Sequence, residues 1–338
     1  MADVERMNHP ASAAPADVVE DPFLQQLLND TEKACTLVQD ARQMTNLILY
    51  GEHIDQVLVL KNGLRQLGLE DSMPKSFRNA VADRTDLCSF LEALQKDGLE
   101  LSTIDASLYY WDGKKEHRVK RDDSGKRVRE LASKYKVVQA NRQKMKEPLY
   151  IGELRYTTKR RMPEGGKSST LLKKDVKDIV DDAAQLMPMW DRGHAFVGGK
   201  FSGSSVHCDQ TLWSNIGKNW AGYKILFVWR YGEDSLRVLE QFHKEIIKPP
   251  FNEKERKILQ SAAKVALVGP GDVFVFSGAN AHMTLGVGRA LSLTAYESYV
   301  NLNTRNVHVF TRSGSKEHFE DCIMEDSDLE VMIHTSTN

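Results

Sequence analysis

Two histidines and an aspartate are the residues whose types and spacing best suit a metal ion. His207 and Asp209 form a His-x-Asp pair, and His282 follows 75 positions after the first histidine. On a β-strand, side chains i and i+2 point to the same face, so both members of the pair can reach one ion. Two imidazoles and one carboxylate leave octahedral positions open, as in non-heme Fe(II) oxygenases. The pair alone is weak evidence for such a site, because a structural role is the more common one for a single histidine, and a third ligand would be needed to complete it.

The chain contains a second His-x-Asp pair, His53 and Asp55. It lies in a stretch whose pattern predicts a helix over roughly 52–67. On a helix, residues i and i+2 diverge by about 200° of rotation. We therefore expect this copy to have arisen by chance and to bind no metal.

Further residues around the first pair could bind an organic acid. Residues 196–209 form a stretch rich in glycine and hydroxyl groups that leads into the pair. Lys224 begins the apolar run Ile225–Trp229, and a lysine there is costly unless an anion meets it. A Pro270-Gly271-Asp272 turn precedes the strand that leads toward His282.

The order of these pieces resembles the JmjC family of cupin-fold, 2-oxoglutarate-dependent oxygenases. The resemblance covers roughly residues 148–302 and is specific as a combined pattern. The elements that carry it are Ser204, His207, Asp209, Asn215, Gly222-Tyr223-Lys224, Gly271-Asp272, His282 and Ser292.

The resemblance implies a role for each of these positions. His207, Asp209 and His282 would bind Fe(II), and the cosubstrate would be 2-oxoglutarate. Lys224 would hold its distal carboxylate, with Arg289, which precedes Ser292, as the alternative anchor. Further contacts to the cosubstrate would come from Ser204, Asn215 and Tyr150, with Tyr156 as a second candidate for the tyrosine.

The elements that must position these residues change in character along the chain. Apolar periodicity predicts helices over 22–49, 52–67 and 84–96. Short β-like runs separated by glycines follow from about residue 194 and are typical of a sandwich or barrel. They are Ala195–Gly198, Lys224–Arg230, Lys264–Val268, Asp272–Phe276 and Ala290–Val300.

We therefore expect an α+β chain with a mainly β core, a double-stranded β-helix (jelly roll) with N-terminal helices packed around it. The expected divisions are a disordered N-terminus (1–20), a helical region (21–147), the catalytic domain (148–302) and an extension with an acidic tail (303–338).

Composition limits the other classes of function. The chain has 338 residues, is 41% hydrophobic and has a net charge of −1. The four cysteines form no CxxC pair, and neither a signal peptide nor an apolar run of about 20 residues is present. These features favour a cytoplasmic or nuclear protein without a membrane partner.

One segment has a strong local charge. Residues 112–146 contain 13 Lys or Arg against 5 Asp or Glu. A solvated surface is the usual reason for such a run, and a nucleic-acid surface is the alternative.

Three functions remain open. The first is hydroxylation of a protein side chain, or demethylation through hydroxylation. The second is oxidation of a nucleic acid, with residues 112–146 as the binding segment. The third is a non-catalytic cupin-fold binding module. The oligomeric state is open as well, and a dimer could form through the 22–49 helix.

Overall fold

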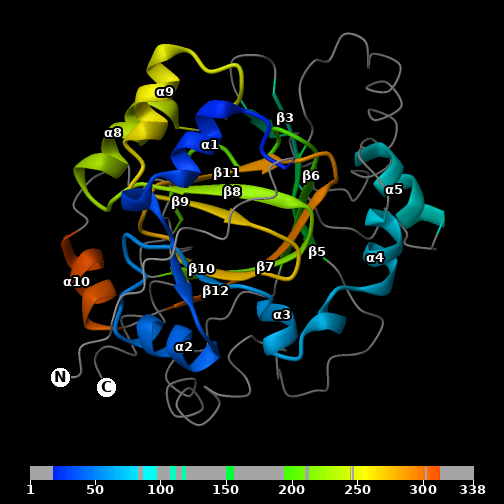
Figure 1. Ribbon diagram of the computed structural model, residues 1–338, viewed down its shortest axis with the longest axis horizontal. Helices are drawn as coiled ribbons and strands as arrows, with labels where there is room; N and C mark the ends of the chain where they lie inside the picture. The colour runs from blue at the N-terminus through cyan, green and yellow to red at the C-terminus, as the bar shows by residue number, and fades with distance from the viewer. Residues whose placement is uncertain are drawn as a thin grey trace, which may run out of the picture.

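The chain folds around two β-sheets, with helices over their outer surfaces (Figure 1). The structure is a computed structural model. It describes residues 18–82, 87–96, 107–111, 116–118, 150–155, 194–209, 213–243, 245, 247–300 and 303–312. Predictions for residues 1–17, for Tyr156, for the acidic tail and for most of 112–146 lie outside these residues.

The larger sheet has nine strands within the described residues, in the order β1-β2-β10-β7-β12-β6-β5-β3-β4. Its neighbours pair antiparallel, except for β1 and β2, which pair parallel. The bounds are Thr36–Val38 (β1), Leu58–Leu60 (β2), Ser107–Trp111 (β3), Glu116–Arg118 (β4), Tyr150–Arg155 (β5), His194–Gly198 (β6), Trp213–Ala221 (β7), Val273–Ser277 (β10) and Ser292–Val300 (β12).

The smaller sheet has the order β11-β8-β9, and its pairs are antiparallel. The bounds are Tyr223–Val228 (β8), Lys264–Val268 (β9) and His282–Val287 (β11). Residues 201–207 run along the free side of β11, with hydrogen bonds from Phe201 N–H to Gly286 O (2.8 Å) and from Thr284 N–H to Ser204 O (3.2 Å). A Cβ atom on Gly203 would lie 1.9 Å from the Thr284 carbonyl oxygen, so this approach requires glycine.

Strands that follow one another in the sequence are divided between the two sheets. The order β6-β12-β7-β10 within the larger sheet faces the order 201–207, β11, β8, β9 in the smaller one. This interleaving is that of a jelly roll. The predicted double-stranded β-helix is therefore confirmed.

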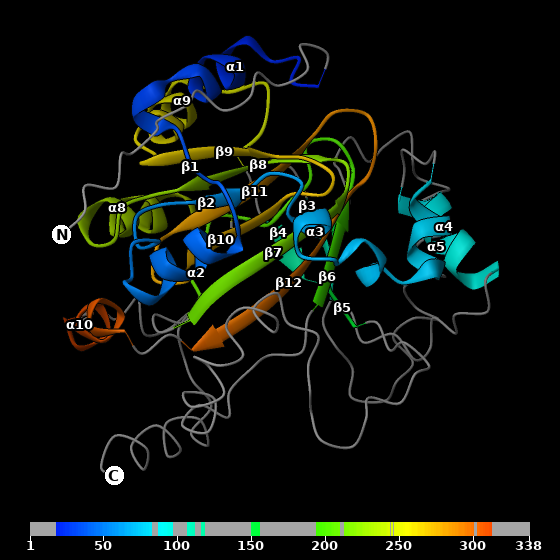
Figure 2. The ribbon, with the colours of Figure 1, turned by 60° about the horizontal axis from the view of Figure 1, so that its bottom comes forward.

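Three apolar clusters hold the layers together. Between the sheets, Leu226 and Val228 of β8 pack with Phe274 and Phe276 of β10. On the outer face of the larger sheet, helices α2, α4 and α5 pack against strands β7, β10 and β12. On the outer face of the smaller sheet, α1 and α9 cover β8 and β9, as Figure 2 shows from the side.

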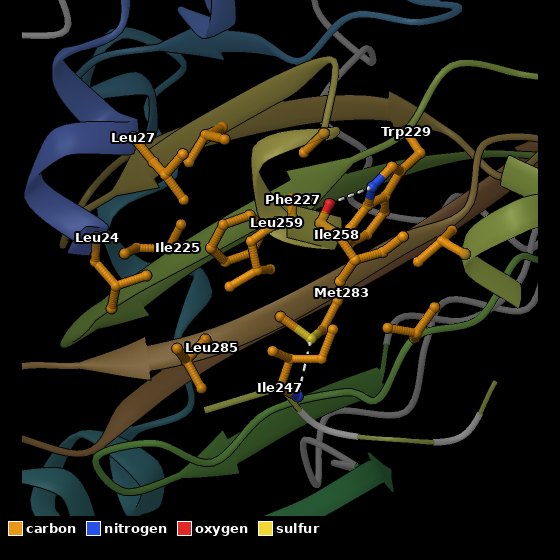
Figure 3. Packing of buried hydrophobic residues seen from close by; sticks show 14 of the residues in the cluster. Leu24, Leu27, Ile225, Phe227, Trp229, Ile247, Ile258, Leu259, Met283 and Leu285 are labelled. Atoms are coloured by element: carbon orange, nitrogen blue, oxygen red, sulfur yellow. Dashed lines mark hydrogen bonds between the residues drawn. The ribbon is translucent and has the colours of Figure 1, made fainter. Parts of the chain in front are cut away.

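Figure 3 shows this last contact in detail. Leu24 and Leu27 of α1 approach Ile225, while Ile258 and Leu259 of α9 lie over Phe227 and Trp229. The indole N–H of Trp229 donates to the Ile258 carbonyl oxygen (3.1 Å). Full burial of a side chain such as Phe227 stabilises the fold by about 1.5–3 kcal/mol. Residues of β8 therefore alternate between two faces. Ile225 and Phe227 pack against the helices on the outer face, and Lys224, Leu226 and Val228 face inward.

The helices differ from the prediction. Their bounds are Pro22–Asn29 (α1), Ala41–Leu49 (α2), Gly63–Gln66 (α3), Lys75–Val81 (α4), Leu87–Lys96 (α5), Glu233–Phe242 (α8), Glu253–Gln260 (α9) and Thr304–Arg312 (α10), with 3-10 turns at Thr31–Lys33 and Glu70–Ser72. The helix predicted over 84–96 is confirmed by α5. No helix of the described residues is long and apolar enough to cross a bilayer.

Two predicted helices are wrong, and in both cases pairing within the sheet outweighs helical periodicity. The stretch 22–49 is divided into α1 and α2, because residues 36–38 pair with β2. The stretch 52–67 contains the strand Leu58–Leu60 between two residues with left-handed backbone, Asp55 (φ 63°) and Asn62 (φ 52°). The expected catalytic boundary at residue 148 stays a prediction, although β1 and β2 extend the larger sheet from before it.

Candidate metal centre

His207, Asp209 and His282 come together in the fold although 75 positions separate the histidines. Their potential ligand atoms all lie within 4.8 Å of one another. Asp209 Oδ1 is 3.6 Å from His207 Nε2, and Asp209 Oδ2 is 3.5 Å from His282 Nε2. No other group of three such side chains is found among the described residues.

Backbone pairing brings the two imidazoles together. His207 N–H donates to His282 O (3.1 Å), and His282 N–H donates to His207 O (2.8 Å). Directly opposed residues of an antiparallel pair carry their side chains on the same face. The two ring centroids are therefore only 4.3 Å apart. Asp209 is fixed by its own N–H, which donates to the Gly278 carbonyl oxygen (2.9 Å).

Both rings are oriented by the chain next to them. His207 Nδ1 lies 2.6 Å from the Ser205 carbonyl oxygen, and His282 Nδ1 lies 2.9 Å from the Asn280 carbonyl oxygen. A carbonyl only accepts, so Nδ1 carries a proton in each ring, which leaves Nε2 as the nitrogen available to a metal ion. This is the tautomer that a metal ligand needs.

Burial keeps His282 neutral. Burial, and secondarily the nearby His207, lower the pKa of His282 to about 4, against the opposing effects of Asp209 and of the bond to the Asn280 carbonyl. The His282 side chain is 3% exposed, whereas those of His207 and Asp209 are 29% and 36% exposed. The candidate centre is therefore shielded from solvent on the side of His282 and accessible to solvent on the side of His207 and Asp209.

Asn215 bonds to the Asp209 carboxylate, and its contact to the cosubstrate stays a prediction. Its Nδ2 donates to Asp209 Oδ2 (2.5 Å), and its Oδ1 accepts from the Ser298 hydroxyl (2.6 Å). Because the Asp209 carboxylate only accepts, the amide nitrogen must face it, and the amide oxygen then accepts from Ser298. Ser298, which the sequence reasoning missed, therefore holds the far side of the amide that faces Asp209.

Lys224 lies on the inner face of β8, where it pairs with Gly286 of β11. It is 3% exposed, and among the described residues its ammonium has no hydrogen-bond or ion-pair partner. Burial lowers the pKa of Lys224 to about 7. The nitrogen lies 5.5 Å from the centroid of the Tyr296 ring. An unpaired buried ammonium is costly, so this position favours an anionic ligand.

The other predicted contacts fall in different places. Ser204 bonds to Thr284 of β11 through its hydroxyl (2.8 Å) and its N–H (2.9 Å). Tyr150 is buried on β5 and packs on Phe196 at 6.1 Å between centroids. Arg289, in contrast, is exposed in the turn between β11 and β12, and the structure does not bring it to the buried face that holds Lys224.

Tyr296 is a half-buried residue beside Lys224 that the sequence reasoning missed. Its ring lies 5.1 Å from that of Phe196 and 6.4 Å from that of Phe276. Burial, and secondarily Asp209, raise the pKa of this phenol. The two-residue alternation of β12 could have identified it, since Thr294, Tyr296 and Ser298 share the face of Ser292.

Fold and site together define a double-stranded β-helix that carries a two-histidine, one-carboxylate set. No protein-family model matches the chain, and no curated protein matches it. Among solved structures, it is similar to YcfD, a ribosomal oxygenase from Escherichia coli, in complex with cobalt and succinic acid. For that structure the TM-score is 0.38 at 12% identity, over 88% of this chain and 67% of that chain.

A second structure of YcfD, in complex with cobalt and 2-oxoglutarate, gives a TM-score of 0.40 at 10% identity over the same shares of both chains. Similarity at this level does not identify an activity. An activity has to be inferred from the side chains of the site.

Proposed function

We propose that this chain is an Fe(II)- and 2-oxoglutarate-dependent oxygenase. The observation that carries the proposal is the convergence of His207, Asp209 and His282, with each Nδ1 against a carbonyl oxygen. Two neutral imidazoles and one carboxylate are the donor set of non-heme Fe(II) oxygenases. These three residues would hold the iron.

Lys224 supports 2-oxoglutarate as the cosubstrate. His282 pairs with Val228, so four residues of β8 separate the metal ligand from Lys224. At about 3.4 Å per residue these four steps span roughly 14 Å. An extended lysine side chain and a five-carbon keto acid together span such a gap. We therefore favour Lys224 over Arg289 as the anchor of the distal carboxylate, through a buried, charge-assisted hydrogen bond.

The protein's own contribution is position and exclusion of water. The Asn215 amide would keep the Asp209 carboxylate turned toward the ion. Apolar side chains of β8 and β10 line the interior behind the site and keep water from the buried side. Iron and 2-oxoglutarate, when bound, supply the activation of oxygen.

The substrate we favour is a protein side chain, hydroxylated or demethylated on the open side of the centre. The exposure of His207 and Asp209 leaves that side accessible to a group on a large molecule. Nucleic acid is the alternative, through residues 112–146. A cytoplasmic or nuclear location completes the proposal.

Succinate formation tests the proposal. Purified protein with Fe(II), ascorbate and 2-oxoglutarate should form succinate, and a cell extract should increase the rate. The matched control is Asp209→Ala. Equal succinate from parent and variant would refute an oxygenase and favour a non-catalytic binding module. Treating the extract with protease or with nuclease then decides between the two substrate classes.

A further inference from the structure

The second His-x-Asp pair contacts the framework of the metal centre from a distant part of the chain. His53 Nε2 lies 2.7 Å from the hydroxyl of Ser214, the neighbour of Asn215. Asp55 bonds to Asn280, two residues before His282. The turn that contains both residues therefore touches the chain beside two parts of the site.

Asp55 and Asn280 bind each other reciprocally. Asn280 Nδ2 donates to Asp55 Oδ1 (2.6 Å), and the main-chain N–H of Asp55 donates to Asn280 Oδ1 (3.2 Å). Asp55 Oδ1 also accepts from the N–H of Tyr231 (2.6 Å). Asp55 makes these contacts from a left-handed backbone (φ 63°), a conformation that is uncommon outside glycine. Such conformations persist where the surroundings over-determine them.

These bonds leave Asn280 little freedom. Its second amide hydrogen donates to the Trp229 carbonyl oxygen (2.8 Å), and the residue is fully buried. Its own carbonyl oxygen is the acceptor that orients His282 Nδ1. The direction of the His282 lone pair therefore depends on where Asn280 is held.

We propose that Asp55 is a positioning residue of the metal centre, which holds the Asn280 carbonyl where it orients the His282 ring toward the ion. This inference rests on the proposed function, because it assigns Asp55 to the same metal site. Asp55 itself contacts neither metal nor substrate. Residues that bond directly to a metal ligand typically change metal affinity by about 10- to 100-fold when they are removed, and Asp55, which acts one step further out through Asn280, should fall at the lower end of that range.

The test compares three variants as folded, metal-free proteins. Asp55→Gly removes the carboxylate and relieves the left-handed strain. Asp55→Asn keeps an acceptor oxygen and tolerates the same backbone. The matched control is Asn62→Gly, since Asn62 is also left-handed (φ 52°) and makes no side-chain cap bond. Affinity for Co(II) is measured by calorimetry at a temperature where circular dichroism shows each variant folded.

We expect Asp55→Gly to weaken Co(II) binding at least tenfold, Asp55→Asn to weaken it less, and Asn62→Gly to stay within twofold of the parent. Nitrogen-15 NMR of the histidines should show His282 as the Nδ1–H tautomer in the parent and as a mixture in Asp55→Gly. Equal affinity in Asp55→Gly and Asn62→Gly, or an unchanged tautomer, would overturn the inference. A parent protein that binds no Co(II) would refute the proposed function instead.

Discussion

Replacing Lys224 with methionine should stabilise the metal-free protein and abolish its response to 2-oxoglutarate. Methionine keeps the length of the buried side chain and removes its charge. Burial lowers the pKa of Lys224 from 10.5 to about 7. At about 1.4 kcal/mol per pKa unit, this corresponds to a penalty on the order of 5 kcal/mol for the buried ammonium.

The penalty has a defined pH window. Between pH 7 and 10.5, the unfolded lysine binds a proton that the folded one does not, so the free energy of unfolding of the parent rises with pH. Below pH 7 both states are protonated and the full penalty persists. Lys224→Met should therefore be more stable than the parent at pH 7 by a few kcal/mol, and the difference should shrink as pH rises to 9.5.

Urea unfolding of the two metal-free proteins at several pH values measures this difference. The complementary measurement is calorimetric binding of 2-oxoglutarate to the metal-loaded proteins. Losing one partner of a buried charged pair costs about 2–5 kcal/mol, so affinity should fall at least ~30-fold in the variant. Parallel stability profiles, or unchanged affinity for 2-oxoglutarate, would show that Lys224 is not the buried anchor.

Five further variants test three other sets of contacts. Asn215→Ala should weaken Co(II) binding by about 10- to 100-fold, because it removes the hydrogen-bond donor to Asp209. Ser298→Ala should weaken it less, because only the bond that orients this donor is lost. Unchanged affinity of both variants in calorimetry would contradict this role. His53→Gln should flatten the acid side of the stability profile. Burial, and secondarily Arg305, lower the pKa of His53 to about 3. The free energy of unfolding of the parent should therefore decrease as pH falls from about 6.5 toward 3, by up to ~1.4 kcal/mol per pH unit. Urea unfolding between pH 5 and 7 measures that slope, and identical slopes in parent and variant would be the wrong result. Lys218→Met should lower the free energy of unfolding by about 3–5 kcal/mol, because it leaves the buried Glu297 carboxylate unpaired. Adding Glu297→Leu should restore most of this loss. A double variant that is no more stable than Lys218→Met in urea unfolding would refute this.

The candidate metal ligands, whose convergence the structure shows, could be recognised from the sequence because their chemistry is local. A His-x-Asp pair and a histidine after a Gly-Asp turn are visible in the sequence, and buried Lys224 follows from its place at the start of an apolar run. The supporting contacts could not be read in the same way. Asn280 acts through its main-chain carbonyl, which any residue type carries, so side-chain chemistry gives no signal for it.

The second His-x-Asp pair shows the same limit. The sequence pattern predicts a helix around His53 and Asp55, on which their His-x-Asp spacing would be a coincidence. They lie in a turn, because the next residues form β2 in the larger sheet. Val57 and Leu58–Leu60 are a short buried apolar run, which periodicity alone cannot distinguish from a helical segment. Pairing with β10 makes this segment a strand, and β10 lies more than 200 positions away in the sequence.

The strands of the core were easier to predict than the rest. The runs 264–268 and 290–300 were recognised within two residues, because glycine turns bound them and their residues favour strands. Strand β7 was missed. It mixes Ser214, Asn215, Lys218 and Asn219 with apolar residues, and each of these buried polar side chains bonds to a partner far away in the sequence.

A crystal structure of the protein with Co(II) and an inert 2-oxoglutarate analogue would show both halves of the site at once. We expect one ion bound by Nε2 of His207, Nε2 of His282 and the Asp209 carboxylate, with Lys224 Nζ within hydrogen-bonding distance of the analogue's far carboxylate. An ion bound elsewhere, or an analogue whose far carboxylate meets Arg289 while Lys224 stays unpaired, would contradict this expectation.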